Sequence, residues 1–240
     1  MKVKILGTGT CVPSLHRGSS SYLVQAKQLN ILIDVGPSVI RRLLEYGVTT
    51  RDIDIIILTH FHVDHTADLS TFLFVSNYDV EARTKMLSVV AGKGLNDFYK
   101  GLIAVYPWIT PKSYDISLNE ISEGTMKVGG LSITTAPMVH NNESIGMRIE
   151  ENKSVTFSGD TDYTETLVVL ARATDLFVVE CSFPEKKVNG HLDLATLQNV
   201  VGKAKPKRVI LSHLYPDWDD FRGVLHAPYL LGEDGMEIEV

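Results

Sequence analysis

The chain has 240 residues, of which 44% are hydrophobic and 22% are charged, and its formal net charge is −6 at pH 7. These proportions are typical of a globular protein with a sizeable core, and the length suits one domain, residues 1–240. The net negative charge argues against a protein that binds long nucleic acids. No apolar stretch approaches the roughly 20 residues needed to span a bilayer. With two cysteines, no disulfide framework and no signal peptide, we expect a soluble cytoplasmic protein.

Apolar runs separated by turn residues predict strands with interspersed helices along the whole chain. In the first half, strands are expected at Val3–Leu6, Ser21–Ala26, Ile31–Asp34, Ile53–Leu58 and Met86–Ala91, and helices at Ser38–Tyr46, Ala67–Val75 and Leu95–Val105. In the second half, strands are expected at Ser113–Ile116, Met126–Val128, Leu131–Ala136, Ser144–Glu150, Ser154–Ser158, Leu176–Val179, Val209–Leu211 and Met236–Val240, and helices at Glu165–Ala171 and Leu194–Ala204. Short connections over residues 113–158 indicate an antiparallel series. Together these elements predict an α/β fold in which two sheets pack face to face with helices outside.

A dense group of metal-ligand residue types follows the predicted strand Ile53–Leu58, which is apolar except for Asp54. The segment Thr59-His60-Phe61-His62-Val63-Asp64-His65 holds three imidazoles and one carboxylate, the groups that zinc and similar divalent metals prefer. In an extended segment alternate residues project to the same side, so we expect His60, His62 and Asp64 to point together. His65 lies one step further, where a helix is expected to start.

Three further candidate ligands each follow a predicted strand. They are His140 after Leu131–Ala136, Asp160 after Ser154–Ser158, and His213 after Val209–Leu211. Loops at strand ends gather at one rim of a sheet and often carry functional side chains. Each residue alone would be an ordinary loop residue, but their recurrence beside the histidine cluster favours a shared metal site.

The ordered series His60-Phe61-His62-Val63-Asp64-His65, His140, Asp160 and His213 resembles the motif series of the metallo-β-lactamase-fold hydrolases. The resemblance covers nearly the whole chain and implies a four-layer αβ/βα sandwich with the metal site at one edge of the packed sheets. It also implies that His60, His62 and His140 hold a first metal, that Asp64, His65 and His213 hold a second, and that Asp160 bridges the two.

Several segments are similar to the tRNA 3′-end endonuclease (ribonuclease Z) branch of this superfamily. They are Leu6-Gly7-Thr8-Gly9-Thr10, Pro13-Ser14, Arg17-Gly18-Ser19-Ser20-Ser21, Ile33-Asp34-Val35-Gly36, Ser158-Gly159-Asp160-Thr161, Val179-Glu180-Cys181-Ser182-Phe183 and Gly190-His191-Leu192. The resemblance implies that Glu180 orients His191, which assists at the phosphate. In that branch a protruding arm between the segments matching His140 and Asp160 grips the tRNA, whereas here these residues are only twenty positions apart.

We therefore expect a dinuclear metal-dependent phosphodiesterase, in which a hydroxide shared by two metals attacks a small or flexible phosphodiester. The expected catalytic residues are Asp64, Glu180 and His191. Zinc is the expected metal, and manganese and iron suit the same ligands. The alternatives are a tRNA 3′-end endonuclease with a reduced tRNA-binding exosite, a hydrolase of sulfate esters, lactones or thioesters, and a metal-binding regulatory module without catalytic activity.

Some features carry no assignment from the sequence. Cys11, Cys181 and His16 have no expected role, and His16 reads as a solvated loop residue. The segment 215–226, with Trp218, Phe221 and His226, either lines the entrance of the site or belongs to the core or a dimer surface, which is the favoured interpretation. A homodimer is the usual expectation for such a chain, without membrane partners and with nucleic acid not favoured.

Overall fold

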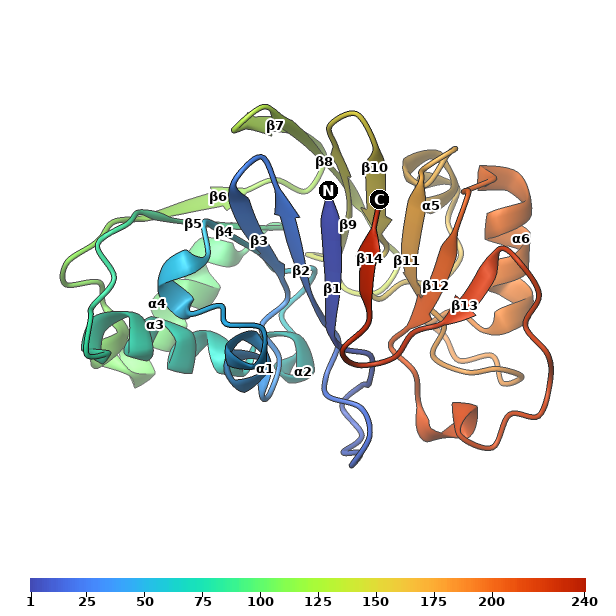
Figure 1. Ribbon diagram of the computed structural model, residues 1–240, viewed down its shortest axis with the longest axis horizontal. Coiled ribbons are helices and arrows are strands. Elements are labelled where there is room, and N and C mark those ends of the chain that lie inside the picture. Colours follow the sequence, from blue (N-terminus) through green and yellow to red (C-terminus); the bar gives the residue numbers. More distant parts are fainter.

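The computed structural model describes residues 1–240, and two mixed sheets of seven strands each pack face to face in it, with helices on both outer sides (Figure 1). In the first sheet the strand order is β14-β1-β2-β3-β4-β5-β6, and in the second sheet it is β13-β12-β11-β10-β9-β8-β7. The strands of the first sheet are β1 (Lys2–Gly7), β2 (Ser21–Ala26), β3 (Leu29–Ile33), β4 (Ile55–Ile57), β5 (Leu87–Ala91), β6 (Ile116–Glu120) and β14 (Glu237–Glu239). Those of the second sheet are β7 (Gly124–Val128), β8 (Leu131–Pro137), β9 (Ile145–Glu150), β10 (Ser154–Phe157), β11 (Leu176–Glu180), β12 (Val209–Ser212) and β13 (Tyr229–Leu231). This architecture confirms the predicted αβ/βα sandwich.

Helices cover the outer face of each sheet. On the first sheet lie α1 (Val39–Glu45), α2 (Val63–Thr66), α3 (Asp68–Tyr78) and α4 (Leu95–Val105), and on the second lie α5 (Glu165–Leu170) and α6 (Leu194–Ala204). Short 3-10 helices occur at Thr50–Asp52, Pro107–Ile109 and Pro216–Trp218. The helix α6 begins where the Asp193 side chain accepts a hydrogen bond from the Thr196 backbone N–H, so its start is fixed by an N-cap. None of the helices has the length and apolar character that a transmembrane segment requires.

The strand β4 shows why Ile55–Leu58, the part of the predicted strand Ile53–Leu58 that follows Asp54, carries no polar alternation. Ile55 and Ile57 belong to the core between the two sheets, whereas Ile56 and Leu58 belong to the core between the first sheet and its helices. Successive side chains of a strand point to opposite faces, so a strand in the middle layers of a sandwich must be apolar on both. The run therefore places Thr59 and His60 at the end of a fully buried strand.

The structure departs from the expected strands at β6 and β13. The strand expected at Ser113–Ile116 begins only at Ile116 and runs to Glu120, in the first sheet, where β6 pairs parallel with β5. This edge strand is only partly buried and holds just two apolar residues, Ile116 and Leu118, so its alternating pattern is short and weak. The edge strand β13, with three residues, was not expected. The antiparallel series expected over residues 113–158 is confirmed for β7 to β10, and only β6, which lies in the first sheet, falls outside it.

The ends of six strands meet at one rim of the sandwich. The strands β3, β4, β8, β10, β11 and β12 all run in the direction that brings their carboxyl ends to this rim. The residues that follow them include the motif at His60, and His140, Asp160 and His213. The topology therefore gathers residues that are up to 153 positions apart in the chain, from His60 to His213.

Candidate metal centre

The structure brings all seven candidate metal ligands together at the rim. Two groups are close enough to hold an ion each, because one ligand atom from every member lies within 4.8 Å of the others. The first group comprises His60, His62, His140 and Asp160, and the second comprises Asp64, His65 and His213. The groups are adjacent, since Asp160 Oδ2 also lies 3.5 Å from His65 Nε2 and 3.2 Å from His213 Nε2.

The first group opens toward solvent. His62 is exposed and His140 is half-buried, and His140 Nε2 lies 3.2 Å from His62 Nδ1. On the other side of its ring, His140 Nδ1 lies 3.0 Å from the Gly190 carbonyl oxygen. Because a carbonyl only accepts, His140 Nδ1 carries the hydrogen, and the lone pair of Nε2 faces the cluster. This is the tautomer that a metal ligand needs.

The second group is buried and is backed by a carboxylate that sequence reasoning did not assign. His65 Nδ1 lies 2.7 Å from Asp34 Oδ2, and Asp34 also accepts hydrogen bonds from the backbone N–H and the hydroxyl of Thr59. Asp34 adopts a left-handed backbone conformation, with φ of 58°. A carboxylate directly after an apolar strand was the available signal, although its partner lies 31 residues away in the sequence. Carboxylates of this kind orient a ligating histidine and raise its basicity.

Three buried histidine nitrogens at this centre have no hydrogen-bond partner. They are His60 Nε2, His65 Nε2 and His213 Nε2, and they lie 3.8, 3.5 and 3.2 Å from Asp160 Oδ2. Buried polar atoms are nearly always hydrogen-bonded, so three that converge without partners call for a shared ligand. Imidazole nitrogens and a carboxylate are the donors that a divalent transition metal takes, and the residues therefore fit such an ion.

Protonation states at the centre follow from burial and from neighbouring charges. Burial lowers the pKa of His60 to about 2, so this imidazole is neutral. Burial alone would raise the pKa of Asp160, but His213 and His65 hold it well below its ordinary value. A neutral imidazole and an ionised carboxylate are the forms that bind a metal.

Glu180 and His191 lie beside the two groups. Glu180 is buried, and its Oε1 lies 3.0 Å from His191 Nδ1 and accepts a 2.7 Å hydrogen bond from the Thr161 backbone N–H. Burial lowers the pKa of His191, but the hydrogen bond and charge of Glu180 outweigh it, so the pKa is raised. One ligand atom of His191 lies within 4.8 Å of those of Asp160 and His213. The predicted pair is therefore formed, and it faces the candidate ligands.

One expectation about the local geometry of the motif is wrong. The helix α2 begins at Val63, so Asp64 lies on a helix and not in an extended segment with His60 and His62. The hydroxyl of Thr66 donates to the His62 carbonyl, and the His65 N–H also donates to it, which closes this turn early. The early turn directs Asp64 and His65 toward the second group, as the resemblance implies.

Of the residues left without a role in the sequence, some lie in the core and others at the surface. Trp218 is buried and belongs to the core cluster of the second sheet, whereas His16 is exposed. Tyr215 stacks on Phe183 with ring centroids 4.5 Å apart, and its hydroxyl lies 3.6 Å from Cys11 Sγ. Cys181 is buried, and burial raises its pKa, so it remains an inert thiol.

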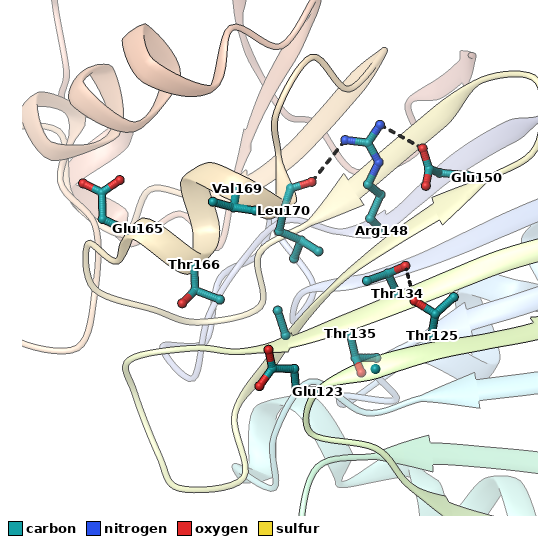
Figure 2. A pocket seen from close by; sticks show the side chains of 12 residues that line it. Glu123, Thr125, Thr134, Thr135, Arg148, Glu150, Glu165, Thr166, Val169 and Leu170 are labelled. Atoms are coloured by element: carbon teal, nitrogen blue, oxygen red, sulfur yellow. Dashed lines mark hydrogen bonds and ion pairs between the residues drawn. The ribbon is translucent and has the colours of Figure 1, made fainter.

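The largest hollow of the molecule is a different region, on the outer face of the second sheet beside α5 (Figure 2). This groove of about 840 Å³ contains no histidine and none of the candidate ligands. Arg148, Glu150, Thr125 and Thr134 point into it, but they are already bound to each other or to backbone carbonyls. A small cavity at the rim is lined by Asp34, His65, Asp160, Glu180 and His213, among others, so the reactive groups gather there and not in the larger groove.

The segment between His140 and Asp160 is short and ordered. It consists mainly of β9 and β10, which pair antiparallel from Glu150 with Ser154 to Met147 with Phe157. A tight turn over residues 151–153 joins them. The chain therefore has no protruding arm between these two residues.

Comparisons with known proteins agree with this geometry. The sequence is 24% identical over 222 residues to the probable metallo-hydrolase YhfI of Bacillus subtilis, covering 89% of this chain and 87% of that protein. It is 25% identical over 246 residues to ribonuclease Z of Mycobacterium bovis (strain BCG / Pasteur 1173P2), covering 90% and 86%.

Solved structures share the fold. The crystal structure of the metallo-β-lactamase fold protein YhfI has a TM-score of 0.82 at 22% identity over 99% of both chains. That of the short form of human tRNase Z has a TM-score of 0.82 at 20% identity, over 100% of this chain and 99% of the other. The family model described as Anti-Pycsar protein Apyc1 matches residues 1–230. The chain therefore belongs to the Anti-Pycsar protein Apyc1 family and is a metallo-hydrolase of the metallo-β-lactamase fold.

Proposed function

We propose that the protein is a phosphodiesterase that uses two divalent metal ions to hydrolyse a small or flexible phosphodiester. The observation that carries this proposal is the convergence of three unpartnered imidazole nitrogens on Asp160 Oδ2, with His191 beside them. Two adjacent sets of ligands that share one carboxylate suit a pair of ions, which is the arrangement that phosphoester hydrolysis uses repeatedly.

The seven residues divide between the two ions as the two groups do. His60, His62 and His140 would hold the first ion, Asp64, His65 and His213 would hold the second, and Asp160 would contact both. Zinc suits these nitrogen and oxygen donors, and so do manganese and iron. When bound, the two ions would supply a nucleophile from water at neutral pH and would offset negative charge on the phosphoryl group.

The side chains next to the ligands supply the proton transfers. His191 Nδ1–H donates to Glu180, so the other ring nitrogen, Nε2, is the one that can serve the substrate. Because Glu180 raises the pKa of His191, a protonated ring is available to donate a proton from Nε2 to the departing alkoxide oxygen. The Asp64 side chain is only 13% exposed, and its carboxylate could accept a hydrogen bond from the attacking water and orient it.

Two features favour a small substrate over tRNA. The turn over residues 151–153 replaces any arm that could grip a folded RNA, and the net charge of −6 gives no general attraction for a polyanion. A short diester needs only the metals and the adjacent side chains to bind. We therefore propose a small-molecule or short phosphodiester substrate.

A substrate panel tests the proposal. The zinc-loaded protein would be given bis(p-nitrophenyl) phosphate, a precursor tRNA at physiological salt, an aryl sulfate, a lactone and a thioester. We expect turnover of the diester and little or none of the others. Cleavage of the precursor tRNA would support an endonuclease with a reduced grip. Preferential turnover of the sulfate, lactone or thioester, or binding of two ions without hydrolysis of any ester, would overturn the proposal.

A further inference from the structure

Ser182 lies at the junction between the second ligand group and the Glu180–His191 pair. It is completely buried, and its Oγ lies 2.8 Å from Glu180 Oε2, 3.0 Å from His213 Nδ1 and 3.2 Å from His191 Nδ1. We propose that Ser182 is a positioning residue through which the Glu180 carboxylate, which holds the ring of His191 directly, also fixes the ring of His213. The inference rests on the metal-binding part of the proposed function.

The direction of the hydrogen bonds follows from a count of donors. The backbone N–H groups of Thr161 and Leu192 both donate to Glu180, at 2.7 and 3.2 Å, so this carboxylate acts as an acceptor. A serine hydroxyl has one hydrogen to donate and can accept through its lone pairs. The shortest contact of Ser182 Oγ is the one to Glu180, which offers no hydrogen, so the hydroxyl donates there.

The hydroxyl can then only accept from His213. Its hydrogen is used at Glu180, so His213 Nδ1 must carry a hydrogen to make the 3.0 Å contact. The opposite nitrogen, His213 Nε2, is then the one with a free lone pair, and it lies 3.2 Å from Asp160 Oδ2 and 3.7 Å from Asp64 Oδ2. Ser182 therefore selects the tautomer in which His213 can bind a metal through Nε2.

One carboxylate thus controls two histidines with different tasks. Glu180 binds His191 Nδ1–H directly through Oε1 and reaches His213 through Ser182 from Oε2. The two imidazoles lie nearly parallel, with ring centroids 5.5 Å apart and planes inclined by 11°. Outer partners of this kind hold ligating histidines in one orientation, and their removal lowers metal affinity about 10–100-fold.

The test compares Ser182→Ala with Ser76→Ala, because Ser76 is also a completely buried serine but its hydroxyl has no hydrogen-bond partner. Zinc would be titrated into chelator-stripped protein against a competing chelator. We expect Ser182→Ala to weaken one of the two zinc equivalents by about 10–100-fold and leave the other unchanged. Ser76→Ala should bind both as the wild type does, and Ser182→Thr, which restores a hydroxyl, should recover most of the lost affinity.

A spectroscopic measurement on the wild type keeps the inference falsifiable if the variants do not fold. In long-range ¹H–¹⁵N spectra of the ¹⁵N-histidine-labelled, zinc-loaded protein, His213 should carry its hydrogen on Nδ1. A His213 ring with the hydrogen on Nε2, or a folded Ser182→Ala protein with wild-type affinity for both equivalents, would overturn it. Neither readout measures turnover, so a zinc protein that hydrolyses no diester would contradict the proposed function and leave this inference standing.

Discussion

The metal centre at the rim and the groove beside α5 differ in whether their polar groups have hydrogen-bond partners. The groove is large and open, yet Arg148, Glu150, Thr125 and Thr134 in it already have partners (Figure 2). The cavity at the rim is far smaller, but buried nitrogens of His60, His65 and His213 there have none. Cavity volume alone would place a binding site in the groove, whereas the buried nitrogens without hydrogen-bond partners place it at the rim. Buried polar atoms without partners are the better guide, because folding leaves few of them without a reason.

The largest effect should come from removing ligands at the rim. Asp64→Ala, and the double variant His60→Ala with His62→Ala, should abolish hydrolysis of bis(p-nitrophenyl) phosphate. Metal analysis of the purified variants should show less bound metal, because each change removes donors that no neighbouring side chain replaces. Retained turnover in either variant would refute the two-metal account.

Removal of His191 should separate chemistry from metal binding. His191→Ala should lower kcat by about 10²–10⁴-fold, the usual contribution of a general acid, with bound metal unchanged. Steady-state rates and metal content of the same preparation check this. A parallel loss of metal would identify His191 as a ligand or a structural residue instead.

Asp34 gives an effect of intermediate size on the second ligand group. Asp34→Asn replaces an acceptor of the His65 Nδ1 hydrogen bond with an amide that can present a donor, so the ring loses its fixed orientation. Zinc affinity should fall about 10–100-fold, as for other outer carboxylates. Competition titration with a chelator measures the change, and an unaltered affinity would mean that packing alone holds the ring.

The pH profile reports on Glu180. Its charge raises the pKa of His191, so the protonated ring persists to a pH above the ordinary histidine value of about 6.5 and activity declines only beyond it. Glu180→Gln removes that charge and should move the alkaline limb of kcat to lower pH. A limb that stays in place would assign it to another group.

The groove should show the smallest effect. Thr134→Val removes the hydrogen bond to Thr125 on the outer face of the sheet, away from every candidate ligand. Turnover of the diester and bound metal should both match the wild type. Lost activity in a folded Thr134→Val protein would make the groove part of the substrate site and would break the contrast with the rim.

The parts of the fold that sequence predicts well are those whose residues carry their own pattern. The helix α6 and the buried strand β2 have the predicted bounds, because amphipathic spacing and apolar runs mark them. The strand β6 was misplaced and β13 was missed because both are partly exposed edge strands of three to five residues, which pairing with a neighbour defines more than side-chain burial does.

The same distinction applies to the candidate site. The histidine motif stands out by its density, and His140, Asp160 and His213 stand out because they recur at strand ends in the same chain. The supporting roles of Asp34 and Ser182 do not, because a carboxylate and a hydroxyl are common and their partners are remote in the sequence. Left-handed backbone at Asp34 and His213, with φ of 58° and 52°, aims these side chains, and no local pattern indicates it.

The most direct test of the central claim is the rate of bis(p-nitrophenyl) phosphate hydrolysis as zinc is added stepwise to chelator-stripped protein. A two-metal centre predicts negligible hydrolysis without metal and a rate that rises until two equivalents per chain are bound. A rate that is independent of metal, or that reaches its maximum at one equivalent, would contradict a two-metal centre.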